Sequence, residues 1–441
     1  MRQPNDLNAF WLPFTPNRNF KSAPRMLTRA QGMYYYDDAG RELIDSCAGL
    51  WCVNAGHGRK QIADAIATAA RELDFAPNFQ FAHPSVFTLA QRIAALAPEG
   101  LDNVFFVNSG SEATDTALKI ARAYFQKIGQ GSRFRLFGRE KGYHGVTMAG
   151  IAVGGLGNNR KPYGPLISGT DDHLPFPYDP ATMRFTKREP QTGGNYADAL
   201  ENLVALHGAE TIAAVIVEPF AGSGGVYASP KDYLNRLRAI CDKYGILLIF
   251  DEVITGFGRL GHAFAAERYG VVPDMINFAK GVTNGAVPMG GVVVSRKIYE
   301  AFENEKNADH QIGLFHGNTY SGHPLACAAG IATLDIYRDE GLFERAAKLE
   351  SVLEDAVHSL RGEPFVVDIR NVGLAAGIEL EADPKAPGRR GFDAIKLAFS
   401  EQNMVMRVGG DNIALSPPLI ASESDIVKIV DNVRGVLKSL T

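Results

Sequence analysis

Lys280 stands two residues after a short apolar run, residues 275–278, that reads as a buried strand. A lysine at the end of such a strand is partly desolvated, which lowers the pKa of its amine and favours the neutral form that Schiff-base chemistry needs. The alternative is a surface lysine whose stem lies along the end of the strand. Lys280 is therefore a candidate nucleophile whose role depends on its surroundings.

Carboxylates follow two other apolar runs. Asp251 comes directly after residues 246–250, and Glu218 comes directly after residues 213–217. A carboxylate at the exit of a buried strand is costly unless it meets a cation or several hydrogen-bond donors. Magnesium could be that cation, but no second acidic cluster of ligand spacing is evident in the sequence. A protonated heterocyclic nitrogen is an equally good partner.

Two further segments contain small residues at places where a ligand could approach. Ser109, Gly110 and Ser111 lie between an expected strand and a helix, where hydroxyls and backbone N–H groups can receive a phosphate. A tight turn with a serine cap explains the same pattern, which matches neither GxGxxG nor GxxxxGK[ST]. Tyr143 and His144 are flanked by glycines, so that an aromatic ring could lie against a flat ligand or simply be buried in a turn.

Together these features describe the needs of one molecule, pyridoxal 5′-phosphate (PLP). Its phosphate fits the serine–glycine turn, its ring nitrogen fits the acid at 251, and its ring face fits the aromatic residue at 143. Its aldehyde fits the lysine at 280. The residues alone therefore predict a PLP site, with no metal.

The elements that must position these residues alternate between strand and helix. Apolar runs predict strands over residues 103–107, 134–137, 213–217, 246–250, 275–278 and 291–295. Helical periodicity predicts helices over residues 59–73 and 86–96, from 112 to about 126, and from 230 to 244. We expect Ser229 to cap the last of these, with Pro230 in its first turn and Gly245 at its end. The alternation predicts an α/β fold with a doubly wound, mostly parallel sheet, and a site beyond the carboxyl ends of its strands.

The two flanks of the chain have a different pattern. Residues 34–44 read as a hairpin, and the region beyond 322 contains long amphipathic helices and short strands. We therefore expect a large domain over residues 60–322 and a smaller α+β domain built from residues 1–59 and 323–441. The segment 150–194, rich in Gly and Pro, is expected to be irregular surface.

The composition limits the classes of function. The 441 residues include 45 basic and 49 acidic side chains, a net charge of −4, which offers no electrostatic footprint for a nucleic acid. Four cysteines match no zinc signature, and the sequence contains neither a secretory signal nor a run of about 18 apolar residues. We expect a cytoplasmic protein that acts on small molecules, without a nucleic-acid or membrane partner.

At its candidate site residues the sequence resembles the class III, PLP-dependent aminotransferases, which have the aspartate-aminotransferase-like fold (fold type I). The resemblance is carried by residues 248–259, by Pro273-Asp274 and by Ala279-Lys280-Gly281, and it extends over almost the whole chain. Within that family the sequence is most similar to the ω-amino acid (β-alanine):pyruvate aminotransferases, notably at residues 17–20, 279–288 and 322–324. This similarity implies transfer of an amino group from an ω-amino acid or amine to pyruvate, giving an aldehyde or ketone and alanine.

The resemblance also implies roles for the cofactor-binding residues. Lys280 would bond to the cofactor and move the donor proton, and Asp251 would pair with the ring nitrogen. Val253 and Tyr143 would pack on opposite faces of the ring. Gly110 and Ser111 would hold the phosphate, and we count Ser109, His144 and Glu218 with this set. Thr319 resembles a threonine that reaches the phosphate in a neighbouring subunit, which implies a homodimer or homotetramer with sites at the interface.

Substrate-binding residues are implied in the same way. Arg407 is similar to the mobile arginine of the family, whose guanidinium binds a carboxylate and moves aside for other donors. Trp51, Phe14 and Phe79 would form an aromatic pocket. Ser223 stands where γ-aminobutyrate and ornithine aminotransferases usually carry a glutamate that pairs with this arginine, so Arg407 should remain available for carboxylates.

Several alternatives share these residues. A taurine, polyamine or diamine aminotransferase, an aminomutase or a decarboxylase would need the same cofactor site. A nicotinamide-dependent dehydrogenase can share a doubly wound sheet, but the glycine fingerprint for a dinucleotide is missing from the sequence.

Overall fold

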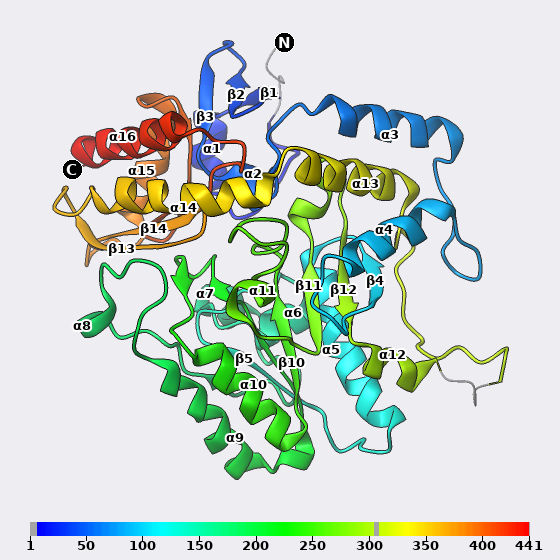
Figure 1. Ribbon diagram of the computed structural model, residues 1–441. Coiled ribbons are helices and arrows are strands. Elements are labelled where there is room, and N and C mark those ends of the chain that lie inside the picture. Colours follow the sequence, from blue (N-terminus) through cyan, green and yellow to red (C-terminus); the bar gives the residue numbers. More distant parts are fainter. Residues whose placement is uncertain (1–6, 304–307, 441) are drawn as a thin grey trace.

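A seven-stranded sheet forms the centre of the molecule (Figure 1). The computed structural model describes residues 7–303 and 308–440. The strand order is β4 (Asn103–Val107), β12 (Gly290–Val294), β11 (Met275–Phe278), β10 (Leu247–Asp251), β7 (Ile212–Val217), β5 (Arg135–Arg139) and β6 (His173–Leu174). Only β12 is antiparallel to its neighbours. The predicted mostly parallel sheet is therefore confirmed.

Helices cover both faces of this sheet, which explains why its central strands are apolar throughout. Leu247 and Ile249 pack with residues of α5 (Gly110–Lys127), whereas Leu248 and Phe250 pack on the opposite side with residues of α10 (Tyr233–Tyr244). The alternation follows from the two-residue period of a strand. Because β7, β10 and β11 run in parallel, Val217, Asp251 and Phe278 end at the same edge.

The expected helices are present, and only the start of α10 differs from its expected position by more than two residues. Helices α3 (Lys60–Glu72) and α4 (Pro84–Ala94) lie where the periodicity places them, and Gly245 ends α10 with a φ of 66°. However, α10 begins at Tyr233 with Asp232 at its cap position, so Ser229 and Pro230 both precede the helix, and the Ser229 hydroxyl donates to the Pro219 carbonyl at 2.7 Å.

The segment 150–194 is only partly irregular. It contains the end of α6 (Met148–Val153), the short helices α7 (Gly157–Arg160) and α8 (Pro180–Met183), and strand β6 at the edge of the sheet. The expectation of irregular surface was therefore wrong for β6, whose two residues gain strand character only by pairing with β5.

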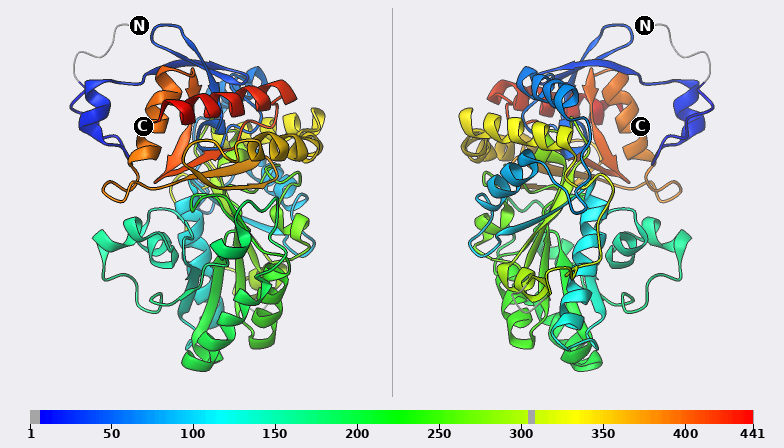
Figure 2. Two further views of the ribbon diagram at one scale, coloured as in Figure 1. Left: turned by 90° about the vertical axis from the view of Figure 1, so that its left-hand side faces the viewer. Right: turned by 90° about the vertical axis from the view of Figure 1, so that its right-hand side faces the viewer.

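N- and C-terminal segments meet in a second sheet. The hairpin of β2 (Tyr34–Asp37) and β3 (Glu42–Asp45) is confirmed; β1 (Leu27–Gln31) pairs with β2, and β15 (Met404–Val405) pairs in parallel with β3. A third sheet has the order β13 (Val366–Val372), β14 (Ala375–Leu380), β17 (Asn412–Leu415) and β16 (Arg407–Gly409). Figures 1 and 2 show strands β1–β3 and the last helix, α16 (Glu423–Ser439), at the same end of the molecule.

Three more long helices belong to the C-terminal part of the chain. They are α13 (Pro324–Asp339), α14 (Leu342–His358) and α15 (Arg389–Ser400). Helix α13 packs against α3 and α4, and α14 packs against α16. The pairing of β3 with β15 supports a small domain built from both ends of the chain, and its limits at 60 and 322 remain our proposal.

The remaining elements are short. They are α1 (Asn17–Ser22), α2 (Ala48–Trp51), α9 (Ala199–His207), α11 (Ala265–Tyr269), α12 (Arg296–Phe302), β8 (Phe220–Ala221) and β9 (Tyr227–Ala228). Over residues 7–303 and 308–440, no helix is long and apolar enough to cross a membrane.

Candidate active site

A cavity of about 130 Å³ lies at the carboxyl edge of the central sheet. Eight of the residues expected at the cofactor site line it: Gly110, Ser111, Tyr143, His144, Glu218, Asp251, Val253 and Lys280. They come from four strand ends and from the start of α5, which the chain brings together only in the folded state.

Lys280 follows β11 and lines this cavity, with a φ of 50°. A left-handed conformation costs a residue with a side chain about 1–3 kcal/mol and is typical of functional sites. Burial and the positive charge of Arg407 lower the pKa of the Lys280 amine to about 8. Within the described part of the chain its Nζ has no hydrogen bond or ion pair, so the amine is available to a ligand.

Asp251 is buried beside His144. The Asp251 Oδ2 atom lies 2.7 Å from Nδ1 of His144, and Oδ1 accepts a hydrogen bond from the Val253 N–H at 3.2 Å. The carboxylate therefore retains acceptor capacity for a protonated ring nitrogen. The other ring nitrogen of His144, Nε2, is buried and has no hydrogen-bond partner among the described residues.

Glu218 holds the loop that carries the aromatic residue of the site. Its Oε1 accepts from the Tyr143 N–H at 3.0 Å and its Oε2 accepts from the Gly222 N–H at 3.2 Å. Burial raises the pKa of this carboxyl group, with a smaller contribution from the charge of Asp251. Glu218 thus fixes the backbone at Tyr143 in addition to lining the cavity.

The start of α5, where a phosphate is expected to bind, lies at the cavity. A Cβ on Gly110 would lie 2.9 Å from Cγ1 of Val253, so only glycine allows this close approach. The first backbone N–H groups of a helix have no intrahelical acceptor and favour an anion. Ser111 accepts a hydrogen bond from the Val146 N–H at 3.1 Å, whereas Ser109 does not line the cavity and instead caps α5 by accepting from Glu112 N.

Arg407 begins β16, near the cavity but outside its lining. Its positive charge lowers the pKa of Lys280. Burial raises the pKa of the Tyr143 phenol, and the charge of Arg407 opposes that rise. The half-buried guanidinium has no hydrogen bond or ion pair within residues 7–303 and 308–440.

The aromatic residues expected at the site do not all come together in one chain. Trp51 is buried, with its ring centroid 6.0 Å from that of Phe220, which lines the cavity. Phe14 and Phe79 are 81% and 56% exposed, and Thr319 is also exposed. None of these three residues lines the cavity, and Trp51 does not line it either.

Four lining residues were missed by sequence reasoning: Gly145, Phe220, Ile254 and Thr255. Ile254 and Thr255 lie inside the motif 248–259, and their closeness to Asp251 in the sequence could have identified them as lining residues. Phe220 follows Glu218 by two residues, but nothing in its own surroundings distinguishes it from a core aromatic residue.

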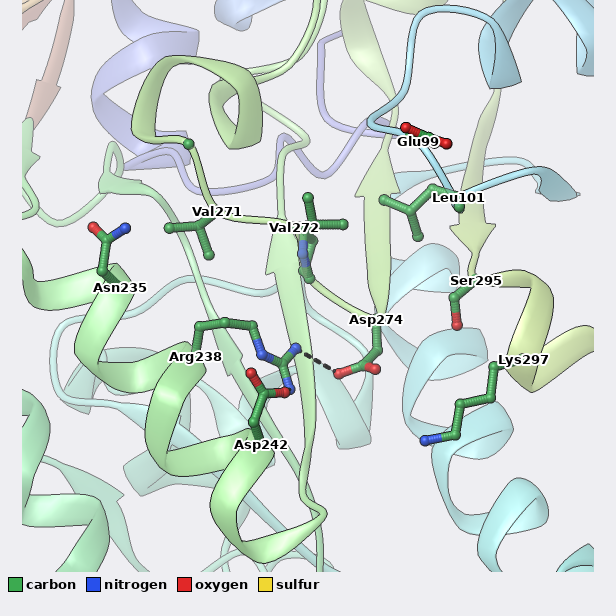
Figure 3. Close-up of a pocket in the computed structure, with 13 residues that line it drawn as sticks. Glu99, Leu101, Asn235, Arg238, Asp242, Val271, Val272, Asp274, Ser295 and Lys297 are labelled. Carbon is green, nitrogen blue, oxygen red and sulfur yellow. Dashed lines mark hydrogen bonds and ion pairs between the residues drawn. The ribbon is translucent and has the colours of Figure 1, made fainter.

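A second cavity, of about 460 Å³, lies at the opposite edge of the sheet (Figure 3). There Arg238 pairs with Asp274 at 2.7 Å and with Asp242 at 2.8 Å. Asp274 also accepts from the Leu248 N–H at 2.8 Å. The Pro273-Asp274 pair of the sequence motif therefore joins α10 to β10, and its charges are already satisfied.

The model of the family "Aminotransferase class-III" matches residues 15–437 of this chain. The chain belongs to the class-III aminotransferases. This family membership confirms the aminotransferase prediction and argues against the nicotinamide-dependent alternative.

Curated relatives of this class-III aminotransferase extend over nearly its whole length. An omega-aminotransferase of Caulobacter vibrioides is 56% identical over 433 residues, covering 98% of both chains. A beta-alanine–pyruvate aminotransferase of Pseudomonas aeruginosa is 47% identical, covering 99% of this chain and 96% of its own.

Solved structures agree with the fold of the class-III aminotransferase. An amine transaminase from an uncultivated Pseudomonas species, in its PLP-bound form, has a TM-score of 0.90 and 36% identity, covering 99% of this chain and 100% of its own. An (S)-enantioselective omega-transaminase of Thermomicrobium roseum has a TM-score of 0.89 and 36% identity, covering 97% and 95%. The expected fold type I is therefore confirmed.

Proposed function

We propose that this class-III aminotransferase uses PLP to move an amino group from an ω-amino acid or amine donor to pyruvate, giving an aldehyde or ketone and alanine. The observation that carries the proposal is the amine of Lys280, which lies unpaired in the same cavity as Asp251. The 47% identity to a beta-alanine–pyruvate aminotransferase supports the choice of substrates.

The residues of the cavity fit PLP. The unpaired Lys280 amine matches its aldehyde, and the free acceptor capacity of Asp251 matches a protonated ring nitrogen. The N-terminus of α5 at Gly110 and Ser111 suits its phosphate. Tyr143 and Val253 would flank the ring. When bound, PLP supplies an electron sink for the pair of electrons left behind when the donor loses its α-proton.

Lys280 is the proton carrier of the proposed reaction. With a pKa of about 8, a substantial fraction of its amine is neutral near physiological pH and can accept a proton at Nζ. The same group then returns the proton to a neighbouring carbon. Asp251, held by His144 at 2.7 Å, keeps a proton at the ring nitrogen by pairing with it.

Arg407 would bind the carboxylate of pyruvate or of an ω-amino acid. A guanidinium presents two parallel N–H donors that match a carboxylate. Since Arg407 has no partner within the described residues, no ion pair must be broken before a substrate binds. Trp51, beside Phe220, would contribute an apolar wall for donors without a carboxylate.

We also propose that a second copy of the chain completes the site, as a homodimer or within a homotetramer. Phe14, Phe79 and Thr319 are exposed although they resemble site residues of the family. Phe79 lies against the loop of Thr319, since a Cβ on Gly317 would be 2.8 Å from the Phe79 ring. Exposed apolar groups of this kind mark contact surfaces.

A polyamine donor is the second candidate. A putrescine–pyruvate aminotransferase of Pseudomonas aeruginosa is 38% identical to this chain over 436 residues.

All four cysteines are free thiols, which supports a reducing, cytoplasmic location.

A donor panel tests the proposed function. The purified holoenzyme is incubated with pyruvate and β-alanine, putrescine, taurine or 1-phenylethylamine, and the alanine formed is measured. We expect alanine with β-alanine and with 1-phenylethylamine. Absence of alanine with every donor would contradict pyruvate as the acceptor, and formation from putrescine alone would favour the second candidate.

A further inference from the structure

Asp45, the last residue of β3, holds the turn that leads to Trp51. Its side chain has no exposed surface. The Oδ1 atom accepts from the Cys47 N–H at 2.9 Å, and Oδ2 accepts from the Gly49 N–H at 2.8 Å. Oδ2 also lies 2.8 Å from Nε2 of His57. One carboxylate therefore organises three groups of the following segment.

The turn that Asp45 holds has an unfavourable backbone. Ala48, Gly49 and Trp51 have φ values of 44°, 66° and 64°, in the left-handed region that residues with side chains rarely adopt. Such conformations persist only where surrounding contacts determine them. Asp45 accepts hydrogen bonds from the N–H of Gly49, inside this stretch, and from the N–H of Cys47, directly before it, and these are contacts of that kind.

His57 is itself fixed against Asp45. Its backbone N–H and C=O pair with Gly32, at 2.9 and 3.0 Å, and the ring of Tyr35 lies 4.2 Å from the imidazole, centroid to centroid. The imidazole is thus placed from two sides before it meets the carboxylate.

The position of Trp51 depends on this turn. Its indole Nε1 is buried and has no hydrogen-bond partner among the described residues, so the ring is placed by the turn and by packing in a cluster with Ile254 and Leu260. The ring lies 6.0 Å from Phe220 at the cavity wall. The turn is also joined to the strand before Arg407, because the N–H and the hydroxyl of Ser46 both donate to the Val405 carbonyl, at 3.1 and 2.9 Å.

We propose that Asp45, with His57 as its partner, is a positioning residue that holds Trp51 at the donor side of the site and so determines how well aromatic donors are used. The inference deepens the proposed function, because it rests on the role of Trp51 as a pocket wall. Nothing in it requires Asp45 to touch a substrate or PLP.

Asn is the substitution that tests the carboxylate at constant shape. In Asp45→Asn, one carboxylate oxygen becomes an NH₂ group. This donor would face either the Gly49 N–H and His57 or, after a flip of the amide, the Cys47 N–H. His57→Phe removes the other partner and keeps a ring against Tyr35, which keeps the inference testable if Asp45→Asn fails to fold.

Asp37 provides a matched control in the same sheet. It is also buried, ends the neighbouring strand β2, and accepts from the N–H groups of Ala39 and Arg41 at 3.0 and 2.8 Å. Asp37→Asn should therefore lower thermal stability in a similar way without acting on the turn of Trp51.

Tryptophan fluorescence reads the position of the ring directly. The chain has two tryptophans, Trp11, which is 86% exposed, and Trp51. In a Trp11→Phe background the emission of the holoenzyme comes from Trp51 alone. We expect Asp45→Asn and His57→Phe to shift this emission to the red and to increase its quenching by acrylamide, and Asp37→Asn to change neither.

The same variants are assayed with two donors. We expect the ratio of kcat/KM for 1-phenylethylamine to that for β-alanine to fall by about tenfold in Asp45→Asn, the lower end of the discrimination that one apolar pocket contact supplies. Emission and ratio equal to those of Asp37→Asn would overturn the inference. So would a changed emission with an unchanged ratio, because Trp51 would then not select the donor. Failure of the unmodified enzyme to form alanine would contradict the proposed function instead.

Discussion

At the scale of single residues, the proposed reaction depends on the Lys280 amine, whose pKa burial lowers to about 8. In Lys280→Ala we expect alanine formation to fall by about 10²–10⁴-fold, because the proton carrier is lost, while the circular dichroism spectrum and Tm stay close to those of the unmodified enzyme. Lys297→Ala, at an exposed lysine of the opposite edge, is the control and should retain activity. Retained transamination in Lys280→Ala would refute the assignment of Lys280.

The lowered pKa of Lys280 has a consequence for pH. Only the neutral amine can bond to an aldehyde, so the rate at which the apoenzyme takes up PLP should rise with pH through about 8 and level off above it. The charge of Arg407 lowers the pKa of Lys280, so the inflection should lie at higher pH in Arg407→Gln, where this charge is removed. The rise in absorbance of the bound cofactor measures both, and an inflection near the ordinary value of 10.5 would contradict this reading.

We expect Arg407 to distinguish between classes of donor. Since a hydrogen bond to a charged group contributes about 1.5–3 kcal/mol, Arg407→Ala should lower kcat/KM for β-alanine and pyruvate by roughly tenfold to a hundredfold. The half-reaction in which 1-phenylethylamine donates its amino group should show a much smaller fall in kcat/KM. Arg407→Lys, which keeps the charge without the planar fork, should lie between the two. Equal losses for both donors would remove Arg407 from carboxylate binding.

At the scale of elements, the start of α5 and the loop after β10 must approach closely. Gly110→Ala would place a Cβ 2.9 Å from Val253, and overpacking of this kind costs about 1–3 kcal/mol. We expect weaker binding of PLP, measured as a higher Kd by absorbance titration. The double variant Gly110→Ala, Val253→Ala removes the clashing methyl groups and should recover part of the affinity; no recovery would mean that the clash is not the cause.

Element boundaries show where local sequence patterns are insufficient. The strand before Asp251 and the helix end at Gly245 follow from a run of apolar residues and a left-handed stop, both of which are local. Ser229 has the sequence context of a helix cap, yet its hydroxyl is used by the Pro219 carbonyl. The helix begins at Tyr233, beyond the reach of Ser229 as a cap.

At the scale of the whole molecule, exposed apolar side chains predict association of two copies. We expect the wild-type protein to sediment as a dimer or tetramer. Phe79→Asp should weaken association by about 2 kcal/mol or more, because a few buried anchor residues carry most of the binding energy of an interface. Leu206→Asp, at a 70% exposed position on α9, is the control. Sedimentation velocity measures both, and a wild-type monomer at micromolar concentration would contradict a shared site.

The sequence by itself indicated the chemistry and the order of the elements, since the candidate amine and the two candidate carboxylates lie at or within two residues of the end of a strand, and the period of the apolar residues identifies that strand. Lys280, Asp251 and Glu218 could be found because strand ends in a parallel sheet share one edge. Only the tertiary structure decided which residues far apart in the chain complete that edge. The contact of His144 with Asp251 and the hold of Asp45 on the turn of Trp51 arise from distances through space, and the two-residue strand β6 exists only through its pairing with β5. No local periodicity records such contacts, because their energy comes from neighbours that the chain brings together only on folding.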